Sequence, residues 1–126
     1  MAGSGNETLG AASASGANIF FDGAGADLVN TGAGNAVVEA GTGAATVNMG
    51  AGIDLLVFVN GSAGGSALVN GFVPGTDHID AQLYAGNPTI AAGASATIAN
   101  NAITFTLPDN TTITLAGVTS LANVFA

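Results

Sequence analysis

The stretch DGAGADLVN-TGAGNAVVE-AGTGAATVN-MGAGIDLLV (residues 22–57) decides the fold of this 126-residue chain. Each nonapeptide has glycine at its second and fourth positions and an aliphatic residue at its eighth. A less regular copy, SASGANIFF (13–21), precedes the stretch in the same register, and AGSGNETLG (2–10) lies two residues out of phase. Self-similarity at a fixed short period is the sequence pattern of a solenoid, so the chain is predicted to be one.

The residue types within each copy indicate how the chain folds locally. Glycines two positions apart allow a tight turn, because glycine adopts backbone conformations that other residues avoid. The β-branched and apolar residues that follow favour a short strand, whose side chains alternate between two faces. Two copies therefore make one coil of 18 residues with a strand on each side. The predicted core is the inward ladder of eighth positions: Leu9, Phe20, Val29, Val38, Val47 and Leu56.

Alternate copies lie on the same sheet, so the outward positions of each sheet follow from the repeat. One sheet is predicted to present Ile19, Val37 and Leu55 outward, flanked by Phe21, Glu39 and Val57. A contiguous apolar patch of this kind indicates cover by another layer or another molecule. The predicted self-association face is Ile19, Phe21, Val37, Leu55 and Val57. The other sheet presents Leu28 and Thr46, with Asn30 and Asn48 one coil apart, and is predicted to be solvated.

Composition excludes several classes of function. The chain has eight acidic residues, no lysine or arginine and a net charge of −8, so it has no basic side chain to neutralise phosphates. Nucleic acid is therefore excluded as a partner, and an anionic membrane surface would repel the chain. Uninterrupted apolar stretches are too short for membrane insertion. Hydrophobic residues nevertheless make up 48 % of the chain, which predicts a packed core rather than disorder.

The C-terminal part follows a different pattern. After Phe72 the nine-residue period disappears, and a short helical turn is predicted at residues 78–84. From Ser95 onward threonines alternate with apolar residues, as in half-buried strands, with turns predicted at Asn100-Asn101 and at residues 108–110. The chain is thus predicted to be all-β: a parallel β-solenoid (β-roll) over residues 1–72 and an antiparallel β-meander cap over 73–126. The meander is expected either to cover the apolar sheet or to cap the last coil.

The repeats resemble the RTX, or hemolysin-type, nonapeptide family, whose pattern is G-G-x-G-x-D-x-U-x. The segment IDLLVF (53–58), followed by NGFVPGTDHIDAQLY (70–84), is similar to the region that closes such rolls, and residues 103–126 look like the tail of type I secreted proteins. The resemblance implies export without an N-terminal signal, which agrees with an N-terminus that lacks a positive and apolar leader. It therefore implies a secreted, extracellular or cell-surface protein.

The resemblance also implies calcium bound between coils by sixth-position aspartates, since calcium prefers oxygen ligands. Here the sixth positions are Asn18, Ala36 and Asp54 on one edge, and Glu7, Asp27 and Ala45 on the other. Neither edge of the repeats stacks two aspartates, so repeated full-strength sites are not expected. The candidate calcium ligands are Asp27, Asp54, Asp77 and Asp80, with Asp22 as a further carboxylate. The alternative is that Asp27 and Asp54 are solvated turn residues.

Catalytic motifs are absent from the sequence, and the chain is predicted not to be an enzyme. His78 is the single histidine, and no G-x-S-x-G motif accompanies it. One histidine without cysteine is also a poor zinc donor set.

Three functional hypotheses follow. The first is a structural, secreted subunit that self-assembles as a homo-oligomer or polymer into an extracellular fibre, surface layer or matrix. The alternative is a calcium-responsive binding and secretion module of a larger toxin, lipase or adhesin. A third is ice or surface binding through a regular Thr/Asn ladder, for which the second sheet offers only Thr46 and two asparagines.

Overall fold

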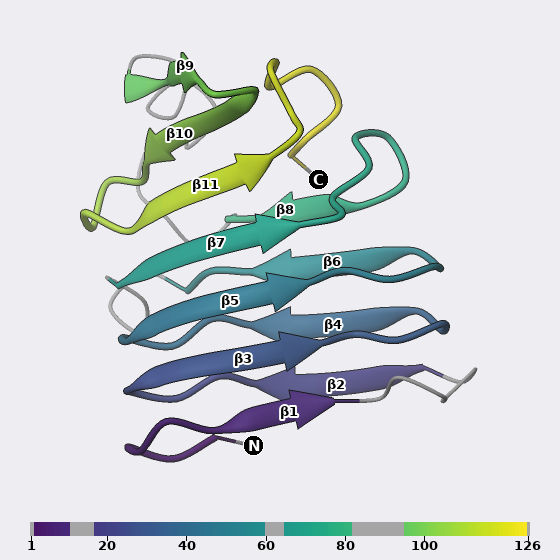
Figure 1. The fold of residues 1–126 in the computed structure, drawn as a ribbon, viewed down its shortest axis with the longest axis vertical. Coiled ribbons are helices and arrows are strands. Elements are labelled where there is room, and N and C mark those ends of the chain that lie inside the picture. The colour runs from purple at the N-terminus through teal and green to yellow at the C-terminus, as the bar shows by residue number, and fades with distance from the viewer. Residues whose placement is uncertain (1, 11–16, 60–64, 82–94, 126) are drawn as a thin grey trace.

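A computed structural model describes residues 2–10, 17–59, 65–81 and 95–125. These residues form two sheets that face each other across a single core (Figure 1). The seven-stranded sheet has the order β1 (Thr8–Gly10), β3 (Ala26–Asn30), β5 (Ala44–Asn48), β7 (Ser66–Asn70), β11 (Thr112–Ala116), β10 (Ala102–Thr106) and β9 (Thr97–Ala99). The four-stranded sheet has the order β2 (Asn18–Phe21), β4 (Ala36–Glu39), β6 (Asp54–Val57) and β8 (His78–Asp80). The predicted all-β solenoid is confirmed.

The strand register confirms the 18-residue coil. Leu28 pairs with Thr46 across β3 and β5, and Val38 pairs with Leu56 across β4 and β6, all in parallel ladders. Successive strands in Figure 1 therefore lie one above another, with the chain crossing from one sheet to the other at each turn. Side chains at equivalent repeat positions form continuous rows up the solenoid.

The core is the ladder that the repeat predicts. Val29, Val38, Val47 and Leu56 are almost completely buried, Phe20 is buried, and Leu9 packs against them at the partly exposed first coil. The inward rows continue upward through Val69 and Leu115 on one sheet and through Ile79 on the other. Burying a Val or Leu side chain contributes about 1.5–3 kcal/mol, so these rows are the main source of stability.

The solenoid extends past the point where the nine-residue period ends. Strand β7 pairs with β5, and β8 pairs with β6, in the same parallel arrangement as the earlier coils. The helical turn predicted at 78–84 is wrong for residues 78–80, which form β8, while residues 82–84 lie outside the described part. The predicted domain boundary at residue 72 falls between these two strands.

The sequence does contain a signal for these two strands. GSALVN (65–70) matches GADLVN (25–30) at four of the six positions. GTDHID (75–80) matches GIDLLV (52–57) in its glycine, its aspartate two residues later and its aliphatic residue four residues later. The segments 58–64 and 71–74 interrupt the period without ending the solenoid.

The C-terminal meander caps the last coil by extending one sheet. Strand β10 pairs antiparallel with β9 and β11, and β11 continues the seven-stranded sheet in parallel with β7. Asn100 and Asn101 have φ values of 52° and 58°, as the predicted two-residue hairpin requires. Ile98 is the exception to the expected half-buried pattern, since β9 is the outermost strand and this side chain is exposed.

The glycines of the turns allow the coils to stack closely. A Cβ atom on Gly41 or Gly50 would collide with the backbone carbonyl of Gly23 or Gly32 in the coil below. Neither Gly41 nor Gly50 has a positive φ. At these two positions glycine is needed for the approach of one turn to the next rather than for an unusual backbone conformation.

Candidate functional site

The outer face of the four-stranded sheet carries the predicted apolar patch. Ile19, Val37 and Leu55 pair in register on β2, β4 and β6, with Phe21 and Val57 beside them. Ile19 is 66 % exposed and Phe21 is 43 % exposed, whereas the other three are half-buried. The structure therefore brings all five predicted residues onto one outward surface, named the apolar face below.

Polar groups border the apolar face on one side and interrupt it at one point. Glu39 lies in register between Phe21 and Val57, and the row ends at Asp80 on β8. His78 ends the other row, opposite Leu55. The face is thus apolar toward the first coil and acidic toward β8. Asp80 belongs to this outward row, so it lies apart from the other candidate calcium ligands, which are buried.

Asp54 and Asp77 do stack one coil apart, contrary to the expectation from the repeats alone. Asp77 takes the sixth-position place in the coil of β8, so its Oδ1 accepts a hydrogen bond of 3.0 Å from the Asp54 amide. The other oxygen, Oδ2, accepts one of 2.9 Å from the Val73 amide. The expectation failed because the interruptions before residue 77 hide its place in the repeat.

Asp54 makes the same contact with the coil below. Its Oδ1 accepts a hydrogen bond of 2.9 Å from the Ala36 amide, and its Oδ2 accepts one of 2.9 Å from the Thr31 hydroxyl. Asp54 and Asp77 are each 1 % exposed, so they are buried caps for backbone amides rather than solvated turn residues. Burial raises the pKa of Asp54 above its usual value.

Asp27 repeats this arrangement on the other edge and adds a carboxylate neighbour. Its Oδ1 accepts a hydrogen bond of 2.8 Å from the Glu7 amide, which is the main reason that its pKa is lowered. Asp22 lies beside it: Asp22 Oδ2 accepts from the Gly41 amide at 3.3 Å, while Oδ1 is buried without a hydrogen-bond partner. Burial, followed by interaction with the Asp27 carboxyl, raises the pKa of Asp22 to about 6. When Asp22 is protonated, its carboxyl group would donate a hydrogen bond to the Asp27 carboxylate.

These carboxylates lie in two pairs, Asp54 with Asp77 and Asp22 with Asp27. Calcium takes about six to eight oxygen ligands, and Asp54 and Asp77 already use their oxygens to accept hydrogen bonds. Across the part of the chain that the structure describes, no three His, Cys, Asp or Glu side chains gather as a metal-binding group. Calcium binding remains a prediction.

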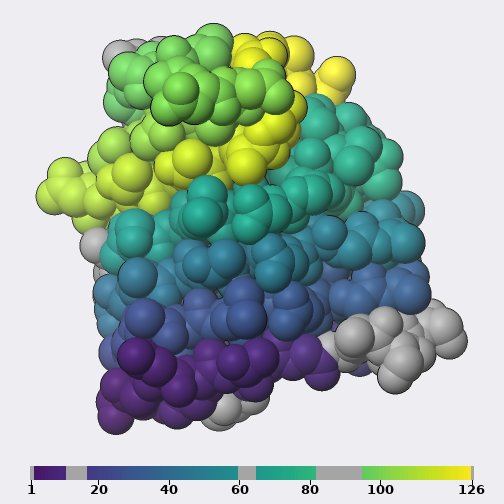
Figure 2. Space-filling view, viewed as in Figure 1, coloured from purple at the N-terminus to yellow at the C-terminus, as the bar shows by residue number. Residues whose placement is uncertain are grey.

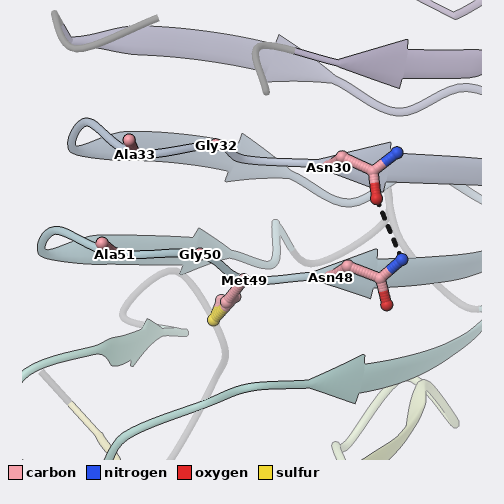
Figure 3. A pocket seen from close by; sticks show the side chains of 7 residues that line it. All are labelled: Asn30, Gly32, Ala33, Asn48, Met49, Gly50 and Ala51. Carbon is pink, nitrogen blue, oxygen red and sulfur yellow. Dashed lines mark hydrogen bonds between the residues drawn. The ribbon is translucent and has the colours of Figure 1, made fainter. Parts of the chain in front are cut away.

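A shallow groove of about 440 Å³ lies where β3 and β5 end (Figure 3). Asn30 and Asn48 line it, together with Met49 and the turns at 32–33 and 50–51. The Asn48 side-chain amide donates a 2.9 Å hydrogen bond to Asn30 Oδ1, and the Asn70 amide donates the same bond to Asn48. The groove lining contains no titratable side chain and so supplies no acid or base.

Comparison with known proteins identifies no family for this chain: no family model matches it, and no curated protein does. The resemblance to the RTX family therefore rests on the sequence patterns alone, those of the repeats and of the C-terminal segments. Within the described residues, none of the elements is a helix long and apolar enough to cross a membrane.

Proposed function

We propose that this chain is a structural, self-assembling β-solenoid subunit of an extracellular fibre, surface layer or matrix. The observation that carries the proposal is the apolar face, where Ile19 and Phe21 remain exposed on a regular sheet. A second copy of the chain is the occupant that the proposal assigns to this face. The proposal includes secretion, which rests only on the RTX resemblance.

The position of the C-terminal meander supports an intermolecular partner. The sequence allows the meander to cover the apolar sheet, but β9, β10 and β11 instead extend the opposite sheet. Ile19, on β2, is 66 % exposed, and β2 lies far from the meander in Figure 1. Burial of these side chains by another molecule would remove apolar surface from water, at about 25 cal/mol per Å².

Charge is expected to regulate the assembly. Subunits with a net charge of −8 repel one another, and Glu39 and Asp80 lie within or beside the apolar face. Salt screens such repulsion, with a Debye length near 10 Å at about 0.1 M ionic strength. Self-association should therefore increase as salt is added.

The test is light scattering and negative-stain electron microscopy of the whole chain at increasing concentration and salt. Ile19→Glu and Phe21→Glu should each reduce assembly, because each places a further negative charge on the apolar face. Leu68→Glu is the matched control: Leu68 is 42 % exposed on the opposite sheet, and the substitution makes the same change of charge. A monomeric wild type at high concentration and salt would refute the proposal, as would equal assembly by all three variants.

The alternative, a calcium-responsive module of a larger protein, is favoured by one observation: the buried, unpartnered Asp22 Oδ1 beside Asp27. It predicts that calcium added to chelator-treated protein raises the melting temperature, because a ligand that binds only the folded state stabilises it. Asp22→Asn should then weaken this effect. An unchanged circular dichroism spectrum and melting temperature would remove calcium from the account.

A further inference from the structure

The outer face of the seven-stranded sheet carries a second regular array, which extends onto the meander. One outward residue per strand lies in register along the sheet, and hydroxyl side chains dominate this row. From the first coil to the edge of the meander its members are Thr8, Leu28, Thr46, Leu68, Thr114, Thr104 and Thr97. Leu28 lies between Thr8 and Thr46 in this row, and Leu68 lies between Thr46 and Thr114, so apolar side chains alternate with hydroxyls over the solenoid.

Two shorter rows flank the first. Ser66, Thr112 and Thr106 lie in register two residues before or after the main row. Asn30, Asn48 and Asn70 form the row on the other side and are joined by the two side-chain hydrogen bonds of 2.9 Å. Figure 2 faces this sheet and shows it as one broad surface that rises from the first coil to the meander.

The face carries no charge, although the chain is strongly acidic. Asp27, Asp54 and Asp77 point inward, and Glu39 and Asp80 lie on the other sheet. The remaining acids lie before β1 or in turns, where their carboxylates accept hydrogen bonds from backbone amides: Glu7, Asp22 and Asp109. The chain has no lysine or arginine. An uncharged partner fits this face better than an ion or a charged polymer.

The backbone fixes the spacing of the array. Neighbouring strands lie about 4.8 Å apart, and every second residue along a strand is about 6.6 Å further on, so the hydroxyls stand on a two-dimensional grid. Threonine is stiff about χ1, which limits the positions of its hydroxyl and methyl groups. The Thr104 and Thr114 hydroxyl oxygens lie 3.0 Å apart, within hydrogen-bonding distance of each other. An ordered surface of this kind loses little entropy when a partner binds.

We propose that this face binds ice, through water molecules held in order by its rows of hydroxyl, amide and methyl groups. Ice is an uncharged solid whose surface is a regular grid of hydrogen-bonding oxygens, so it matches both the regularity and the neutrality of the face. A crystalline polysaccharide is the competing partner, but flat carbohydrate surfaces are usually held by stacked aromatic rings. None of the three rows contains an aromatic residue. The proposal is independent of assembly through the apolar face.

The experiment grows ice slowly in a dilute solution of the whole chain and measures how much protein enters the ice and whether the crystals develop facets. The wild type should enter the ice and shape the crystals, whereas Thr104→Lys should be excluded with the other solutes. Because Thr104 is half-buried, Thr97→Lys on the exposed outermost strand is a second variant. Circular dichroism and melting temperature verify the fold of each variant.

Ile19→Lys is the matched control, since it introduces the same charge on the opposite sheet and should enter the ice like the wild type. Exclusion of the folded wild type from ice would overturn the proposal. Equal uptake of the wild type and both threonine variants would also overturn it. Pull-down by crystalline cellulose or chitin, with no uptake into ice, would assign the face to a polysaccharide instead.

Discussion

The backbone amide of Asp54 donates a 3.0 Å hydrogen bond to the carboxylate of Asp77, although 23 residues separate them. The same contact joins Ala36 to Asp54 and Glu7 to Asp27. The sixth-position aspartates of this chain therefore link each coil to the one below it. Each carboxylate accepts a hydrogen bond from a backbone amide of the lower coil, close to the turn. This use of the aspartate requires no metal ion.

Loss of the Asp77 carboxylate should destabilise the last coil. Asp77→Ala leaves the buried amide of Asp54 without an acceptor, at a cost of about 1–3 kcal/mol, and removes the acceptor of the Val73 amide, which is more accessible to water. Asp77→Asn retains one acceptor oxygen and should cost less. Urea denaturation of the three proteins measures the difference. An alanine variant as stable as the wild type would show that these hydrogen bonds contribute nothing.

Gly50→Ala should destabilise the fold by about 1–3 kcal/mol or more, because the new methyl group collides with the Gly32 carbonyl and forces two turns apart. Gly10→Ala is the matched control: its φ is not positive, and its Cβ would meet only Asn30 Cβ at 4.0 Å. Thermal melting of both variants tests the explanation. Similar losses at the two positions would attribute the effect to glycine in general rather than to stacking.

Stability should rise as the pH falls through about 6, because of Asp22. The pKa of this carboxyl is about 6 in the folded protein and 3.8 as the ordinary value, so the folded state binds the proton more tightly between these limits. The stabilisation from its protonation begins near pH 6 and is complete below the ordinary value. The lowered pKa of Asp27 acts oppositely, but only at more acidic pH.

Asp22→Asn should raise the melting temperature at pH 8 and flatten its dependence between pH 8 and 5, since the amide keeps a donor for Asp27 and never ionises. Melting curves in metal-free buffer measure this effect. Glu39→Gln removes the same charge from the outer face of the four-stranded sheet and controls for the decrease in net repulsion. Identical pH profiles for the two variants would exclude Asp22 as the cause.

The meander and the solenoid should unfold together. Leu115 is completely buried and lies in register between Val69 and Ile103, so Leu115→Ala should cost about 2–5 kcal/mol across both parts. Hydrogen exchange followed by mass spectrometry should show faster exchange in β5 and β7 as well as in β10. Leu68→Ala, at an exposed position, should have little effect. Faster exchange confined to β9–β11 would identify the meander as a separate unit.

The sequence by itself determined the coil, its core and the two outward faces of residues 18–57. These features depend on local rules: glycine pairs turn the chain, side chains alternate along a strand, and a period of nine places Val29 over Val47 and Ile19 beside Val37. All five residues of the apolar face were predictable for this reason. Their use in assembly remains a proposal.

Only the tertiary structure decided what lies beyond the repeats. The interruptions at residues 58–64 and 71–74 changed the sequence period, but β7 still pairs with β5 and β8 with β6. Paired strands tolerate a longer connection because the entropy cost of closing a loop grows only slowly with its length. Asp77 therefore came to lie over Asp54. The sequence allowed the meander either to cover the apolar face or to cap the last coil. It caps the last coil because β11 pairs with the open edge of β7, which satisfies the backbone hydrogen bonds of both strands. Packing across the apolar face would have left that edge unpaired. Because β11 pairs with β7, the apolar face around Ile19 stays exposed, and the threonine rows continue from the solenoid onto the meander.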